Sequence, residues 1–320
     1  MTARALLLGD LQRVLSLARR RFGYLLAPDR KRQSQDGGEA AIFQSFALLR
    51  ARVQRCENLA ELNPATVLRP FLDLIRHEQT SSTLTSASLE AVRNFLESWP
   101  WRLLKDTSAI SDAVSDVVDA VSQCRFQETS IESDQNVIVM VVDVLHAVLA
   151  SHAAPFLSDH SMWQLVESLY ALSRASRNDR HITFSLRATA TNCLHDAVKF
   201  IFATPSVYSD SSSMPSVGFG LPCAVKTVGF LCQKLHQRSS GSSFASSRRD
   251  VLLALSLLHR MLLSCDPHSI TQVPSLMLFI KDDLCSGLLR FSRLGYRDWF
   301  AYSSLIDVAM FSSRPCIFQT

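Results

Sequence analysis

The sequence predicts an all-α protein in which antiparallel helices stack into a solenoid. Apolar residues recur with the 3.6-residue period of an amphipathic helix in one segment after another. Only 10 glycines and 11 prolines occur in 320 residues, so helix breakers are scarce. Short polar joints separate the segments, strand-like alternation is absent, and no fixed repeat length emerges. These features are typical of an irregular armadillo/HEAT-like array of stacked helices.

The stretch from Pro64 to Leu96 shows the unit of such an array: a helix, a short Ser/Thr-rich joint and a second helix. Asn63 is a suitable N-cap and Pro64 a suitable first helical residue. Residues 77–80 are expected to end this first helix. Both helices carry an apolar stripe at helical spacing. The stripes consist of Leu68, Phe71, Leu72 and Ile75 in the first helix, and Leu89, Val92, Phe95 and Leu96 in the second.

The same spacing predicts further helices on both sides of this pair. They are expected over residues 4–26, 40–62, 110–124, 134–150, 186–203, 221–235, 249–265, 275–290 and 299–311, with one more after a capping box at 161–164. The helix at 134–150 is apolar nearly all round, so we expect it to lie deepest, with His146 as a core histidine. The Trp99-Pro100-Trp101 break is expected to fill a joint between helices rather than to bind a ligand.

Composition places the chain in a reducing compartment. The eight cysteines are scattered without a CxxC pair. We therefore interpret them as small buried residues and disfavour a disulfide framework. Residues 5–8 are too short an apolar core for a secretory signal. The run at 137–150 is interpreted as too short to span a bilayer. The chain is thus expected to be cytoplasmic, with any membrane contact peripheral.

The charge pattern indicates no nucleic-acid partner. The formal net charge is only +4, and basic residues gather only near the N-terminus, at 19–21 and 30–32. Those arginines fit either an anionic-lipid or nucleic-acid patch or a solvated helix end, and we favour the latter because cations suit a helix C-terminus. Asp112, Asp116 and Asp119 likewise fit a solvated acidic face better than a metal site, which needs converging oxygens.

Motifs for catalysis and cofactor binding are missing from the sequence. It has no phosphate loop, no HExxH zinc motif and no GxSxG nucleophile elbow. Cys193 and His195 are two positions apart on a predicted helix and therefore point to different faces. The sequence predicts neither a catalytic residue nor a cofactor or metal site, so we expect no enzyme.

A change in composition predicts the domain organisation. Residues 206–220 are rich in Ser, Pro and Gly and indicate a linker. The linker would separate a helical domain over residues 1–205 from a second helical region over 221–320, which we expect to be incomplete.

Several ordered segments resemble one protein family. The segment LRPFLDLIRHEQT at 68–80 is similar to the PFLEVIRSEDT segment of large Sec7-type guanine-nucleotide exchange factors for Arf GTPases. The DAVSQCRF segment at 119–126, with Ser133-Asp134 after it, resembles the family's DAVTHCRF…TDxxSD segment. The resemblance is strongest to the Golgi brefeldin A resistance factor (GNOM-like) branch. Ser82-Thr83 and Ser86 replace the family's Gly-Pro and Gly, which suggests another turn type in the joint.

This resemblance implies a regulatory role. Residues 1–205 would correspond to the dimerisation and cyclophilin-binding domain, and residues 221–320 to the start of the homology-upstream-of-Sec7 domain. The Sec7 domain and its catalytic glutamate have no counterpart in the 320 residues. The implied partners are a second copy of the chain and the downstream helical domain, with the Golgi membrane surface and small GTPases as further candidates. The implied location is the cytoplasmic face of the Golgi.

An alternative is a stand-alone Mon2-like α-solenoid trafficking adaptor without any exchange domain. Under either hypothesis the function depends on exposed side chains. As the candidate interaction surface we select Arg76, His77, Glu78, Arg125 and Asp134, which lie within the two family-like segments.

Overall fold

The computed structural model confirms an all-α solenoid. It describes residues 3–22, 37–127, 130–175, 182–204, 218–236, 244–265, 270 and 273–287, and no strand occurs in these ranges. The predicted helix at 299–311 and the basic residues at 30–32 lie outside them. The described helices are α1 Ala3–Phe22, α2 Gly37–Arg55, α3 Pro64–Arg76, α4 Ser82–Ser98, α5 Thr107–Ser122, α6 Ile131–Ala150, α7 Asp159–Arg174, α8 Phe184–Ala203, α9 Leu221–His236, α10 Phe244–Ser264 and α12 Pro274–Leu278, followed by a π-helical segment, η5 Phe279–Leu284.

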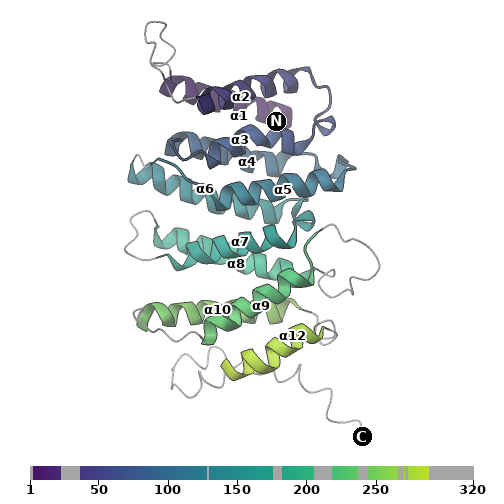
Figure 1. Ribbon diagram of the computed structural model, residues 1–320, viewed down its shortest axis with the longest axis vertical. Helices are drawn as coiled ribbons and strands as arrows, with labels where there is room; N and C mark the ends of the chain where they lie inside the picture. The colour runs from purple at the N-terminus through teal and green to yellow at the C-terminus, as the bar shows by residue number, and fades with distance from the viewer. Residues whose placement is uncertain are drawn as a thin grey trace.

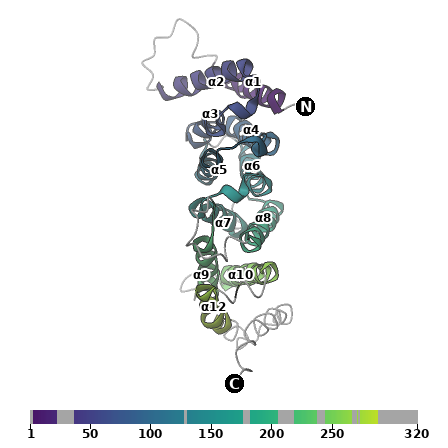
Figure 2. The same cartoon turned by 90° about the vertical axis from the view of Figure 1, so that its right-hand side faces the viewer.

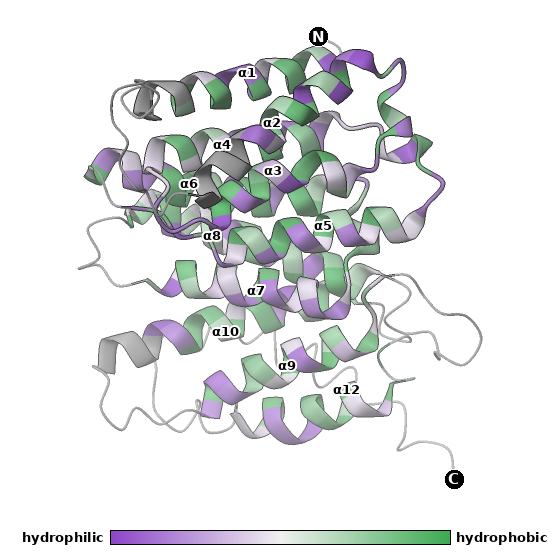
Figure 3. Cartoon of the chain, turned by 45° about the horizontal axis from the view of Figure 1, so that its top comes forward, coloured by the Kyte–Doolittle hydropathy of each residue, from purple (hydrophilic) through white to green (hydrophobic). Residues whose placement is uncertain are grey.

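The helices stack in two layers along the long axis of the molecule (Figure 1). Turned by 90°, the chain shows α3, α5, α7, α9 and α12 in one column and α4, α6, α8 and α10 in the other (Figure 2). Hydrophobic and hydrophilic residues alternate along these helices (Figure 3). The apolar stripes meet between the layers in one core that extends from α1 to η5. In this arrangement each amphipathic helix buries its apolar face against the helices next to it.

The α3–α4 pair forms largely as its sequence predicts. The Asn63 side chain accepts a hydrogen bond from the backbone N–H of Ala65, Pro64 is the first helical residue, and His77 is the C-cap. The predicted Ser/Thr-rich joint is wrong in extent, because α4 already begins at Ser82 and only residues 77–81 connect the helices. Small hydroxyl residues resemble a joint by composition, yet they can return hydrogen bonds to their own helix. Ser88 does so by donating to the carbonyl oxygen of Leu84 at 3.1 Å.

The two tryptophans after α4 fill a joint, as predicted. The ring of Trp99 stacks on Phe95 with 4.3 Å between centroids, and Trp101 meets the same ring edge to face at 5.6 Å. Trp101 also donates its indole N–H to the carbonyl oxygen of Leu96 at 3.0 Å. Both indoles are buried, so they seal the end of α4 against the core.

The prediction for α6 is only partly right. Val137, Val144 and Leu145 are buried, whereas Val139 is 38% exposed and His146 lies on the exposed face. The interpretation of His146 as a core histidine is therefore wrong. At 20 residues, α6 is long and apolar enough to cross a membrane, contrary to the length estimate from the sequence. Its packing against α4, α5 and α8 accounts for its apolar character, because a buried core helix meets the same criteria.

Two other helix starts differ from the prediction. Helix α7 is capped by Ser158, whose hydroxyl accepts from the N–H of Ser161 at 3.1 Å, so it starts earlier than the 161–164 motif suggested. Helix α10 begins at Phe244 rather than at 249. Among the described cysteines all are free, and Cys193, Cys223, Cys232 and Cys265 are buried, as expected for small core residues.

The chain beyond the predicted linker continues the stack. Residues 205–217 lie outside the described ranges, and α9 packs on α7 while α10 packs on α8. Asp159 on α7 accepts hydrogen bonds from the backbone N–H groups of Gly220 and Cys223 at 2.9 and 3.0 Å. Gly218 has φ +138°, and a Cβ there would stand 2.4 Å from the carbonyl oxygen of Pro155, so only glycine fits. A division at 206–220 stays a prediction, but the core itself is continuous.

Candidate functional site

Two family-like segments that are far apart in sequence meet in space. The backbone N–H of Gln127 donates to the carbonyl oxygen of Thr80 at 2.8 Å, and Ser81 and Gln127 form an isolated parallel bridge. This contact joins the α3–α4 connection to the α5–α6 connection along one side of the stack. It therefore places the ends of the segments at 68–80 and 119–126 side by side.

Four of the five predicted interaction residues lie around this contact. Arg76 is about one-third exposed and donates to the carboxylate of Asp119 at 2.8 Å and to the carbonyl oxygen of Asp116 at 3.2 Å. Arg125 and Glu78 form an ion pair whose side chains are 72% and 66% exposed. His77 caps α3 between them. Exposed pairs of this kind contribute only about 0–1 kcal/mol to stability, so these side chains are accessible to another partner.

Asp134 does not belong to this surface. It is only 2% exposed and lies in the first turn of α6, where a carboxylate suits the helix N-terminus. Its backbone N–H donates to the carbonyl oxygen of Ser130 at 2.9 Å. The prediction that Asp134 lies on the interaction surface is therefore wrong, because its side chain is buried. We define the docking surface as Arg76, His77, Glu78 and Arg125.

The described residues contain no cluster suited to a metal ion. Of the three aspartates on α5, Asp119 pairs with Arg76, while Asp112 and Asp116 are exposed. Cys193 is buried, whereas the ring of His195 meets the hydroxyl group of Ser256 at 3.2 Å. The two thus face different neighbours, as their spacing predicted.

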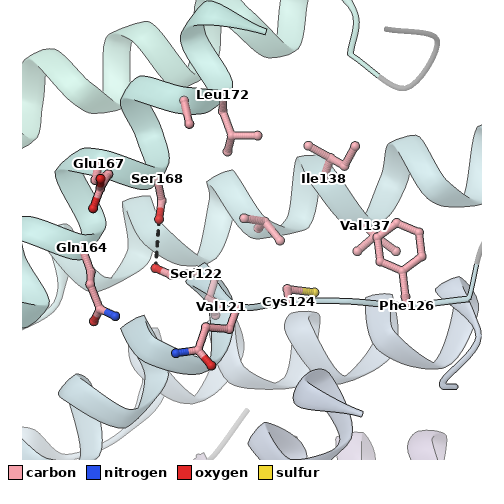
Figure 4. Close-up of a pocket in the computed structure, with 13 residues that line it drawn as sticks. Val121, Ser122, Cys124, Phe126, Val137, Ile138, Gln164, Glu167, Ser168 and Leu172 are labelled. Carbon is pink, nitrogen blue, oxygen red and sulfur yellow. Dashed lines mark hydrogen bonds between the residues drawn. The ribbon is translucent and has the colours of Figure 1, made fainter. Parts of the chain in front are cut away.

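Next to the docking surface lies an open groove of about 480 Å³ between α5, α6 and α7. Its lining residues are Val121, Ser122, Gln123, Cys124, Phe126, Val137, Ile138, Val141, Gln164, Glu167, Ser168, Ala171 and Leu172. Figure 4 shows Phe126, Val137 and Ile138 on one side and Gln164, Glu167, Ser168 and Leu172 along α7. The hydroxyl groups of Ser168 and Ser122 join α7 to the end of α5 at 3.0 Å. The groove exists because α5 packs on α7 and α6 packs on α8, which leaves the first half of α6 uncovered by α7.

The groove is apolar with an acidic margin. Cys124, Phe126, Ile138, Val141 and Leu172 are only partly buried. Desolvation raises the pKa of the Cys124 thiol to about 12, so the group stays protonated at neutral pH and adds to the apolar wall.

Polar acceptors border this apolar wall. The only charged lining residue is Glu167, which is exposed. The side-chain oxygen of Gln164 is buried in the wall and has no hydrogen-bond partner.

Sequence reasoning did not identify the groove. Ile138 and Val141 were assigned to the buried face of α6 by their spacing, and Gln164 and Glu167 were two polar positions on a predicted helix. The only signal in the sequence was the segment at 119–126, whose last residues, Cys124 and Phe126, line the groove.

Comparison with known proteins identifies several guanine-nucleotide exchange factors as relatives. No protein-family model matches the chain. The ARF guanine-nucleotide exchange factor GNL2 of Arabidopsis thaliana is 20% identical over 81% of this chain and 20% of its own length. GNOM of the same plant is 28% identical over 52% of this chain and 11% of its own length. The Golgi-specific brefeldin A-resistance guanine nucleotide exchange factor 1 homolog of Caenorhabditis elegans is 27% identical over 55% of this chain and 9% of its length. The chain thus spans a fifth or less of these relatives.

Proposed function

Because the chain is related to large Sec7-type ARF guanine-nucleotide exchange factors, we propose that it is a regulatory, non-catalytic helical module of such a factor. In this role it binds other proteins through its surface and contributes to vesicle-mediated transport at the Golgi. The observation that carries the proposal is the similarity to GNL2 over 81% of the chain.

Self-association is the first specific part of the proposal. A solenoid with a docking surface along one side is suited to pairing with a second copy or with the downstream helical domain of the same factor. Size-exclusion chromatography with light scattering on the whole chain is expected to show a dimer at micromolar concentration. A strict monomer over this range contradicts the self-association.

The docking surface can be tested by charge reversal. Arg125→Glu places a negative charge beside Glu78 and is expected to weaken self-association about tenfold, and adding Glu78→Arg is expected to restore much of it. Arg102→Glu is the matched control, because Arg102 is exposed and lies outside the docking surface. If all variants dimerise equally well, the docking surface does not mediate self-association.

The non-catalytic part has its own test. The purified chain is expected to leave the rate of nucleotide exchange on an ARF GTPase at the level of buffer alone. Faster exchange overturns it. A Mon2-like adaptor remains the second candidate, since the similarity covers only a fifth or less of each relative. A Sec7 domain encoded in the same reading frame as these residues would favour the exchange factor.

A further inference from the structure

We propose that the groove between α5, α6 and α7 binds an amphipathic helix of a partner protein that carries a Lys or Arg residue beside its apolar face. This inference rests on the proposed role as an interaction module and adds a site and the chemistry of its occupant. The site is separate from the docking surface, because none of Arg76, His77, Glu78 or Arg125 lines the groove.

The shape of the groove favours a helix as its occupant. Its α7 wall runs from Gln164 to Leu172, which corresponds to about 12 Å at ~1.5 Å per residue. That length accommodates about two turns, so two or three apolar side chains at i, i+3 or i+4, and i+7 can enter together. The walls are mainly helix side chains, whose backbone groups are already bonded within each helix. An extended peptide would therefore leave its own backbone groups unpaired, whereas a helix satisfies them internally.

The apolar surface supplies the attraction. Phe126 at one edge and Ile138, Val141 and Leu172 in the walls are each partly buried, so part of every side chain remains in contact with water. Covering apolar area of this kind is favourable by about 25 cal/mol per Å² before the cost of association. Because the cost of association offsets much of this gain, a short helix in a groove of this size is expected to bind weakly.

Charge selects among possible helices. Glu167 is the one charged residue that lines the groove, and it has no ion-pair partner among the contacts recorded for the described residues. A Lys or Arg on the incoming helix can donate hydrogen bonds to the exposed carboxylate of Glu167. The same carboxylate repels an anionic lipid headgroup, so the observations favour a basic helix over a membrane surface.

The probe for this inference is a phage-displayed library of helical peptides of about 14 residues, or four turns, randomised on one face. Selection on the complete 320-residue chain is expected to enrich peptides with two apolar residues three or four positions apart and a neighbouring Lys or Arg. A selection without such enrichment, or with enrichment of acidic peptides, overturns the proposal.

Two substitutions give independent readouts on a selected peptide. Ala171→Phe fills the groove from an exposed position of α7, so it is expected to weaken binding at least tenfold while the fold is retained. Glu167→Lys is expected to weaken binding about tenfold, and changing the peptide's Lys to Glu is expected to recover it. Glu57→Lys, which makes the same charge change at an exposed position away from the groove, is the control.

The outcomes separate this inference from the proposed function. Unchanged peptide affinity in both Ala171→Phe and Glu167→Lys refutes the groove as the binding site, even if the chain dimerises. A chain that stays monomeric and yet binds basic helices through Glu167 refutes self-association and supports the groove. Circular dichroism of each variant confirms that loss of binding is not loss of fold.

Discussion

Asp159 joins the two regions that composition separated, and its removal is the sharpest test of whether they behave as one unit. Gly220 stands at the N-cap position of α9 but has no side-chain oxygen, and Pro222 has no backbone N–H. The carboxylate of Asp159 on α7 accepts instead from the N–H groups of Gly220 and Cys223. A residue of one predicted domain thus caps the first helix of the next.

The expected cost of Asp159→Ala follows from these contacts. Hydrogen bonds to a charged group contribute about 1.5–3 kcal/mol each, and the lower value applies here because Asp159 is only partly buried. Loss of the negative charge at the start of α7 adds about 0.3–1 kcal/mol. With partial replacement of the lost bonds by water, we expect the local opening of α9 to become easier by about 2–3 kcal/mol. Asp159→Asn, which keeps one acceptor oxygen, should cost about half of that.

Native-state hydrogen exchange measures this change helix by helix. A loss of about 2 kcal/mol corresponds to roughly 30-fold faster exchange in α9, with α3 and α4 unchanged. Asp112→Ala, the same substitution at an exposed position of α5, should alter neither region. If Asp159→Ala leaves the protection of α9 unchanged, the capping argument is refuted. If protection falls equally in α3 and α9, the stack unfolds as one cooperative unit and the effect is not local.

Three further predictions concern the core. Trp101→Ala should lower the free energy of unfolding by about 3–5 kcal/mol, while Trp101→Phe, which loses the hydrogen bond to Leu96, should cost less in urea denaturation. Burial lowers the pKa of His195 below its usual value of 6.5, so as the pH falls the unfolded chain takes up this proton at a higher pH than the folded chain does. The free energy of unfolding should therefore decrease as the pH drops below about 6.5, and this decrease should be smaller in His195→Gln. Burial raises the pKa of Cys193 to about 12, so a thiol reagent at pH 8 should modify the more accessible Cys56 first and Cys193 only on unfolding.

Local signals in the sequence were sufficient to predict that the helices exist and where α3 begins and ends. Asn63 and Pro64 start α3 because a side-chain acceptor and a fixed φ satisfy the first turn without help from the rest of the fold. The packing of Trp99 and Trp101 in a joint was likewise predicted, because the proline between them interrupts the helix and two large apolar rings are stabilised by burial between helices. Four of the five candidate interaction residues lie close together in the structure, whereas their role in docking stays a prediction.

Features that depend on tertiary packing could not be predicted from the sequence. The hydroxyl residues of early α4 looked like a joint, because composition does not reveal whether a serine bonds to its own helix or to water. Asp134 was selected by its place in a segment, yet the packing of α6 buries it. The capping of α9 by Asp159 joins residues 61 positions apart, and no local pattern announces it.

The sequence by itself determined that the chain is a stack of amphipathic helices, because the period of its apolar residues decides which face each helix must bury. Only the tertiary structure decided which of those faces are covered. Val141 is four positions from both Val137 and Leu145, which are buried, and so lies on the same face of α6. Yet α7 packs on α5 and leaves Ile138 and Val141 partly exposed at the wall of a groove. The burial of a side chain depends on how neighbouring helices are shifted relative to one another. The apolar period of a single helix carries no information about this shift.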